Sequence, residues 1–124
     1  MAAPWFQQAT KIVAIGRNYL AHVHELNNKV PKTPFWFLKP TSAIIPSGAP
    51  HECPPGRTES HHEVELGVVI GKRAKRVPAE AAMEYVAGYC LALDMTDRQG
   101  QEEAKAAGKP WTACKGWDTS CPIS

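Results

Sequence analysis

The alternation of apolar and polar positions along the chain predicts several short strands and a few helices. The clearest apolar run, Val68 to Ile70 with Leu66, is rich in β-branched residues and ends at Gly71, which is typical of a buried strand. Glu63 and Glu65 precede this run. Because strand side chains alternate, these two carboxylates project from one face, with Cα atoms roughly 6.5 Å apart.

The rest of the pattern predicts a mixed α/β, β-rich fold. Strand-like runs cover residues 11–15, 35–38, 43–45 and 89–93, and helix-like runs cover residues 19–26, 79–86 and 96–107. Asn18 is suited to cap the first helix, Pro78 to begin the second, and Gly108 with Pro110 to close the third. A proline-rich connection, residues 47–60, leads into the strand that carries the two glutamates, and connections of this length often serve as binding loops.

Length and composition indicate one soluble globular domain over residues 1–124. A chain of this size is near the modal size of a domain, and it is 44% hydrophobic and 21% charged. No apolar run is long enough to span a bilayer, so we expect no membrane partner. The formal charge of +2 is too small to indicate nucleic acid.

The four cysteines show no C-x-x-C pairing, and no secretory signal peptide is evident. We therefore expect free thiols in a reducing compartment. The first ten residues contain no Arg or Lys, which argues weakly against a mitochondrial presequence.

The paired glutamates predict a site for a hard divalent cation. Like charges this close repel unless a positive charge lies between them, and carboxylate oxygens are ligands that Mg²⁺ and Mn²⁺ prefer. Asp94 ends a second apolar strand and is either a third ligand or a helix cap, although Thr96 and Asp97 are equally good caps. The alternative for Glu63 and Glu65 is a pair on the solvated edge of a half-exposed strand.

Two further pairs lie at helical spacing. His22 and Glu25 share a helix face, as a general acid/base pair that activates water requires, or they are an ordinary surface pair. Arg98 and Gln101 are positioned to meet an anionic substrate, or they belong to a solvated helix face. Lys115, among small and aromatic residues, is suited to neutralise a carboxylate.

A zinc-binding module is a weaker alternative. Its candidate ligands are His51, Cys53, His61 and His62. These residues lack the paired ligand spacings of structural zinc sites, which counts against the alternative.

Ordered motifs along nearly the whole chain resemble the fumarylacetoacetate hydrolase family, and most closely its small single-domain acylpyruvases. The motifs are Gly16-Arg17-Asn18-Tyr19, His22-Val23-His24-Glu25, Phe37-Leu38-Lys39-Pro40, His62-Glu63-Val64-Glu65-Leu66-Gly67-Val68-Val69-Ile70-Gly71, Leu93-Asp94-Met95-Thr96, Lys115-Gly116-Trp117-Asp118 and Cys121-Pro122. Several blocks in the same order are far more specific than any one motif.

The resemblance implies roles for individual residues. The implied ligands of Mg²⁺ or Mn²⁺ are Glu63, Glu65 and Asp94. The implied catalytic residues are His22 and Glu25, as a water-activating pair, and Lys115. The implied substrate-binding residues are Arg17, Phe37, Lys39, Arg98 and Gln101.

The resemblance also implies a fold, a reaction and partners. The fold is the family's β-roll, of which this chain supplies only the N-terminal half to two-thirds, as a C-terminally incomplete domain. The reaction is Mg²⁺-dependent cleavage of a C–C bond in acylpyruvates such as acetylpyruvate and fumarylpyruvate, or decarboxylation or tautomerisation of oxaloacetate. The implied partners are a small keto acid and a second copy in a homodimer, in mitochondria or the cytosol. The alternative is an inactive fragment that binds a metal or a full-length subunit.

Overall fold

The computed structural model describes residues 5–25 and 29–124, apart from the side chain of His22. The architecture is mixed α/β and strand-rich, as the sequence pattern predicts. In chain order its elements are η1 (Trp5–Gln8), β1 (Ile12–Gly16), α1 (Leu20–Glu25), β2 (Phe35–Lys39), η2 (Thr41–Ala43), β3 (Ile44–Pro46), β4 (Ser60–Ile70), η3 (Ala79–Tyr85), β5 (Val86–Asp97), α2 (Arg98–Ala106), α3 (Thr112–Lys115) and β6 (Cys121–Ile123).

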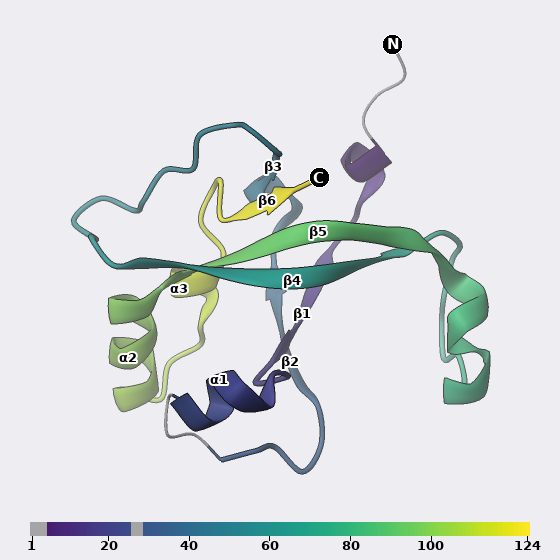
Figure 1. Ribbon diagram of the computed structural model, residues 1–124, viewed down its shortest axis with the longest axis horizontal. Helices are drawn as coiled ribbons and strands as arrows, with labels where there is room; N and C mark the ends of the chain where they lie inside the picture. Colours follow the sequence, from purple (N-terminus) through teal and green to yellow (C-terminus); the bar gives the residue numbers. More distant parts are fainter. Residues whose placement is uncertain (1–4, 26–28) are drawn as a thin grey trace.

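The long antiparallel hairpin β4–β5 crosses the centre of the molecule (Figure 1). Its register pairs Ser60 with Asp97 and Glu63 with Asp94. Directly opposed residues project from the same face of a sheet, so Asp94 joins Glu63 and Glu65 on one side of the hairpin. The register therefore brings Asp94 to the two glutamates, which lie about thirty residues earlier in the sequence.

Strand β6 connects this hairpin to the rest of the sheet, whose strand order is β3-β6-β5-β4. Strand β6 pairs in parallel with β3 and antiparallel with β5. A small core lies at this junction, where Ala43, Cys121 and Ile123 are buried against Phe6 and Ile12, among others. The chain segment before the hairpin is thus packed against the segment that follows it.

Strands β1 and β2 form a separate antiparallel pair that crosses the hairpin in the view of Figure 1. Gly16, the last residue of β1, lies opposite Phe35. A Cβ atom on Gly16 would lie 2.2 Å from Cζ of Phe35, closer than any side chain permits. A larger residue at this position would therefore require the Phe35 ring to shift.

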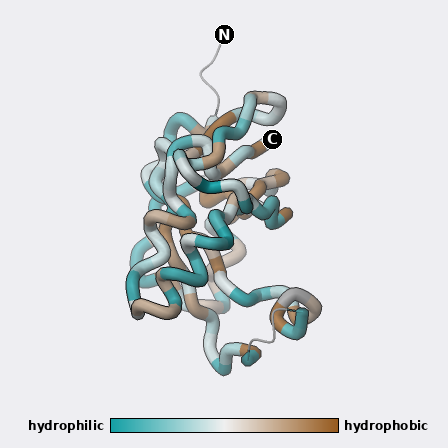
Figure 2. Tube along the Cα trace, turned by 90° about the vertical axis from the view of Figure 1, so that its left-hand side faces the viewer, coloured by the Kyte–Doolittle hydropathy of each residue, from teal (hydrophilic) through white to brown (hydrophobic). Residues whose placement is uncertain are grey.

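The apolar run of β4 is exposed on one face, so the prediction of a buried strand is wrong. Leu66, for example, is 65% exposed, and the side chains exposed with it are Val64, Val68, Ile70, Tyr89 and Leu91. The pair β1–β2 has a second exposed apolar face, formed by Val13, Ile15, Trp36 and Leu38. Figure 2 shows that hydrophobic residues occur in several separate stretches of the trace. Burial of a strand requires a covering layer, which the described residues do not supply to these faces.

The third predicted helix begins only at Arg98, because Thr96 and Asp97 complete strand β5. Asp97 is the helix cap, and its Oδ1 accepts a hydrogen bond from the backbone N–H of Gly100 at 3.0 Å. Asp94 lies three residues earlier, inside the strand. The cap explanation for Asp94 is therefore wrong, and its carboxylate is available for other contacts.

Other predicted elements differ in type or extent. Residues 79–85 form a 3₁₀ helix, and the short elements α3 and β6 were not predicted because three or four residues carry too little periodicity. Leu26, the predicted end of the first helix, lies outside the described residues. Within the described chain, no helix is long and apolar enough to cross a membrane.

Candidate active site

A cavity lies at the end of the hairpin, between β4, β5, α2, α3 and the loop after β1. Its polar lining includes Glu63, Glu65, Asp94, Arg98, Gln101 and Lys115. Its apolar lining includes Ile15, Val23, Phe37 and Trp111. The fold therefore gathers most of the sequence-predicted residues, Arg17 among them, into one cavity.

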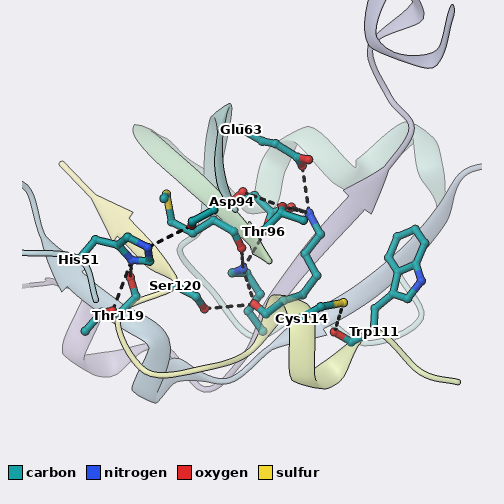
Figure 3. A network of polar contacts seen from close by, with 12 residues as sticks. His51, Glu63, Asp94, Thr96, Trp111, Cys114, Thr119 and Ser120 are labelled. Atoms are coloured by element: carbon teal, nitrogen blue, oxygen red, sulfur yellow. Dashed lines mark hydrogen bonds and ion pairs between the residues drawn. The ribbon is translucent and has the colours of Figure 1, made fainter. Parts of the chain in front are cut away.

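Lys115, in the short helix α3, bridges two of the carboxylates (Figure 3). Its Nζ lies 2.6 Å from Oδ2 of Asp94, 2.9 Å from Oε2 of Glu63 and 2.5 Å from Oγ1 of Thr96. The side chain is only 2% exposed, and its ammonium lies 5.1 Å from the centre of the Phe37 ring. The sequence-based expectation that Lys115 neutralises a carboxylate is thus met by the observed contacts.

Arg98, at the first position of α2, contacts Glu63, Gln101 and His61. Its Nε donates to Nδ1 of His61 at 3.2 Å, and Nε2 of His61 lies 3.3 Å from Oε1 of Glu59. An Nδ1 that accepts a hydrogen bond leaves the ring proton on Nε2, facing Glu59. His61 therefore orients Arg98, whose guanidinium group reaches the cavity.

The charges of these groups act on Glu63 and Glu65 in opposite ways. Burial alone would raise the pKa of Glu63, but Lys115 and Arg98 together outweigh burial and hold that pKa below its ordinary value. Burial raises the pKa of Glu65, and the negative charges of Asp94 and Glu63 raise it further. Among the two glutamates, Glu65 is therefore the one whose negative charge is not compensated within the cluster.

Tyr19 lines the cavity together with Glu65. The negative charge of Glu65 raises the pKa of the Tyr19 phenol, so the phenol keeps its proton beside this carboxylate. In the sequence Tyr19 begins the helix-like run 19–26 and belongs to the motif Gly16-Arg17-Asn18-Tyr19, and neither feature indicates an interaction with Glu65. That interaction depends on where the loop after β1 lies relative to β4, which no local pattern indicates.

The sequence offered Thr96 only as a helix cap and His61 only as a zinc ligand, and neither was predicted to belong to this site. Thr96 is completely buried and contacts Lys115. It stands two residues after Asp94 in β5, so strand alternation places both on one face, and this spacing was the signal available in the sequence. His61 had a comparable signal, since it precedes Glu63 by two residues in β4.

Lys39, predicted to bind substrate, lies behind Asp94, and it is absent from the cavity lining. Its Nζ donates to Oδ1 of Asp94 at 2.7 Å and to the backbone oxygen of Met95 at 3.1 Å. It also donates to the backbone oxygen of Lys115. Burial lowers the pKa of Lys39, although Asp94 opposes this effect.

Of the remaining predicted residues, Arg17 and Phe37 line the cavity. The guanidinium carbon of Arg17 lies 5.7 Å from the centre of the Phe35 ring, and the Phe37 ring packs edge-on against Trp111 at 5.7 Å. Helix α1 carries Glu25 and His22. The side chain of His22 lies outside the described residues, so the pairing of His22 with Glu25 stays a prediction.

The donor set fits a divalent cation. Three carboxylates share one face of the hairpin, and the repulsion that raises the pKa of Glu65 is relieved by a positive charge placed among them. Among the described residues, no group of three His, Cys, Asp or Glu side chains is already arranged closely enough to hold a metal ion. At this cluster Lys115 Nζ lies between Glu63 and Asp94 and takes the position of the positive charge.

The alternative zinc module is not assembled. His51 Nδ1 lies 3.1 Å from the backbone oxygen of Thr119, and its Nε2 lies 3.2 Å from Oγ of Ser60. Cys53 Sγ lies 4.0 Å from His51 Nε2. The described part of the chain has no group of three potential ligands here, and His51 instead attaches the 47–59 connection to the turn before β6.

Residues 11–124 match the family described as "Fumarylacetoacetate (FAA) hydrolase C-terminal". The chain belongs to this family. An Arabidopsis thaliana relative, a mitochondrial oxaloacetate tautomerase, is 56% identical over 119 residues, which cover 96% of this chain and 53% of the relative. A Dictyostelium discoideum relative, a mitochondrial oxaloacetate decarboxylase, is 53% identical over 121 residues, which cover 97% of this chain and 56% of the relative.

Solved structures of the family show the same fold. Fumarylpyruvate hydrolase from Pseudomonas aeruginosa, in complex with Mn²⁺ and pyruvate, superimposes with a TM-score of 0.82 at 38% identity, over 91% of this chain and 51% of that one. A 5-carboxymethyl-2-hydroxymuconate delta-isomerase from Mycobacterium smegmatis superimposes with a TM-score of 0.79 at 40% identity, over 94% of this chain and 45% of that one. The chain thus spans about half the length of the relatives it matches, and it constitutes a partial domain.

Proposed function

We propose that this chain supplies the metal-binding and acid-binding part of an enzyme that acts on small keto acids. One observation carries the proposal: three carboxylates line one cavity together with four cationic side chains. The carboxylates are Glu63, Glu65 and Asp94, and the cations are Arg17, Arg98, Lys105 and Lys115. A divalent cation held by the three carboxylates adds to the positive charge of this lining, which then favours an acid with more than one carboxylate.

Oxaloacetate is the substrate that the relatives favour, through enol–keto tautomerisation or decarboxylation. The Arabidopsis and Dictyostelium relatives are named for these two activities. At neutral pH oxaloacetate carries two carboxylates beside a 2-oxo group, which suits a lining with an excess of positive charge. Cleavage of an acylpyruvate is the second candidate, and the fumarylpyruvate hydrolase neighbour supports it.

Glu63, Glu65 and Asp94 would hold Mg²⁺ or Mn²⁺. When bound, this cation supplies Lewis-acid stabilisation of negative charge on the oxygens of the keto acid. Arg98 and Gln101 bind the acid through its carboxylate, since the guanidinium of Arg98 is already oriented by His61. Lys115 donates a hydrogen bond to the oxygen that gains negative charge. For hydrolysis, His22 and Glu25 take the proton from the attacking water.

The decisive assay compares this chain with a version extended by the C-terminal half of its Arabidopsis relative. Mg²⁺-dependent loss of the oxaloacetate enol, followed by ultraviolet absorbance, is measured beside acetylpyruvate cleavage. We expect activity in the extended form that disappears with EDTA and in Glu63→Gln. A soluble, folded extended form without activity on either acid would refute the proposal.

The chain alone has a second candidate function, as an inactive fragment that associates with a full-length subunit. The exposed apolar residues of β4–β5 and β1–β2 favour this alternative, because faces of this kind usually mark contact surfaces. Co-expression with the Arabidopsis relative and size-exclusion chromatography test it. Leu66→Lys should weaken a complex formed through β4, whereas the exposed control Met83→Lys, on η3, should not.

Two further features follow from the family. The full-length form is proposed to be a homodimer, because family members usually are. A mitochondrial location is proposed because the relatives named above carry that location in their names. Import of the fluorescently tagged full-length form into mitochondria tests the location.

A further inference from the structure

We propose that Lys39 is a positioning residue of this site, which holds Asp94 through Oδ1 and leaves Oδ2 to face the cavity. The inference rests on the proposed function, because it concerns Asp94 as a metal ligand. Lys39 itself does not line the cavity. It would act on the site through Asp94 and through the backbone of Lys115.

The contacts of Lys39 account for the whole hydrogen-bonding capacity of its ammonium group. An ammonium group has three N–H donors, and Nζ of Lys39 has three acceptors: Oδ1 of Asp94 and the backbone oxygens of Met95 and Lys115. The side chain is 1% exposed, so water does not compete for these donors. The ammonium also lies 5.8 Å from the centre of the Trp117 ring.

The two oxygens of Asp94, which Figure 3 labels, are divided between two lysines. Lys39 contacts Oδ1 at 2.7 Å, and Lys115 contacts Oδ2 at 2.6 Å. Only Lys115 belongs to the cavity lining. A cation that enters the cavity therefore meets Oδ2, while Lys39 keeps the carboxylate plane in place from behind, as outer hydrogen-bond partners of metal ligands commonly do.

The position of Lys39 also links segments that are distant in the sequence. It ends β2, and its partners lie 55, 56 and 76 residues further on, at the end of β5 and the end of α3. Because Lys39 donates a hydrogen bond to the backbone oxygen of Lys115, it fixes the backbone from which the Lys115 side chain reaches Asp94 and Glu63. An apolar side chain fills space equally well at lower desolvation cost, so packing alone does not explain a lysine here.

The test measures Mn²⁺ binding to the whole chain, from the electron paramagnetic resonance signal of free Mn²⁺, with circular dichroism as the check of folding. The variants are Lys39→Met, which removes the charge, and Lys39→Arg, which keeps it. The planar guanidinium of arginine cannot reproduce three contacts that diverge from one nitrogen atom. Lys75→Met, the same change at an exposed lysine, is the matched control.

We expect Lys39→Met to weaken Mn²⁺ binding about tenfold or more, Lys39→Arg to weaken it less, and Lys75→Met to leave it unchanged. Wild-type Mn²⁺ affinity in either folded Lys39 variant would overturn the inference while leaving the metal site intact. Failure of both variants to fold would show a purely structural role and would also overturn it. Absence of Mn²⁺ binding in the wild type would instead refute the proposed metal site, and this inference with it.

Discussion

Lys115 Nζ lies 2.6 Å from Oδ2 of Asp94, although the two residues belong to different elements and are separated by 21 positions. The same ammonium group contacts Glu63 on the neighbouring strand. One buried cation therefore holds together two carboxylates that would otherwise repel each other.

Removal of the Lys115 ammonium group, which bridges Glu63 and Asp94, should destabilise the metal-free chain. Lys115→Met leaves Glu63 and Asp94 facing each other in a buried site, and breaking a buried ion pair in this way costs about 3 kcal/mol. Chemical denaturation monitored by circular dichroism measures the loss in unfolding free energy. Lys75→Met, at an exposed position, is the control. Equal stability of Lys115→Met and wild type would contradict the bridging role.

Divalent cations should stabilise the wild-type chain. A cation bound only to the folded state adds about 2.7 kcal/mol when its concentration is one hundred times the dissociation constant. Thermal unfolding with increasing Mg²⁺ or Mn²⁺ measures this shift, and EDTA should reverse it. Glu63→Gln and Asp94→Asn should remove the shift, whereas Glu84→Gln, at an exposed position on η3, should retain it. The same shift in all variants would place the metal elsewhere.

A methyl group at Gly16 should disturb the β1–β2 pair. Its Cβ would lie 2.2 Å from Phe35 Cζ, and crowding of this kind typically costs about 1–3 kcal/mol. Gly88→Ala is the matched control, because no atom lies within 4 Å of the Cβ position there. Urea denaturation measures both variants. A Gly16→Ala variant as stable as Gly88→Ala would mean that the Phe35 ring can move aside without cost.

The buried thiol of Cys121 should ionise only at high pH. Burial raises the pKa of Cys121 to about 11, above its value of about 8.5 in an unfolded chain. The neutral thiol is favoured in the folded state, so this contribution to stability is complete below pH 8.5 and is lost as the pH rises through 11. Labelling with iodoacetamide at pH 8, followed by mass spectrometry, should modify the exposed Cys53 rapidly and Cys121 slowly. Equal labelling rates would contradict the burial of Cys121.

The free thiols themselves were expected from the sequence, and the four cysteines are unpaired in the structure. The class of fold and the family were also predicted, because the motifs around Glu63, Asp94 and Lys115 are local and ordered. Strand alternation predicted that Glu63 and Glu65 share a face. Each of these features depends on residues that are close together in the chain.

Tertiary structure decided the features that depend on distant segments. The register of β4 and β5 placed Asp94 opposite Glu63, and the packing of α3 brought Lys115 between them. Tertiary packing also places Lys39 behind Asp94, whereas the family resemblance had implied that Lys39 contacts the substrate. The exposure of Leu66 likewise depends on whether another layer covers β4, which its β-branched, apolar pattern cannot reveal. Local patterns specify which residue types are present and which face they share, whereas contacts across the fold determine which charges meet.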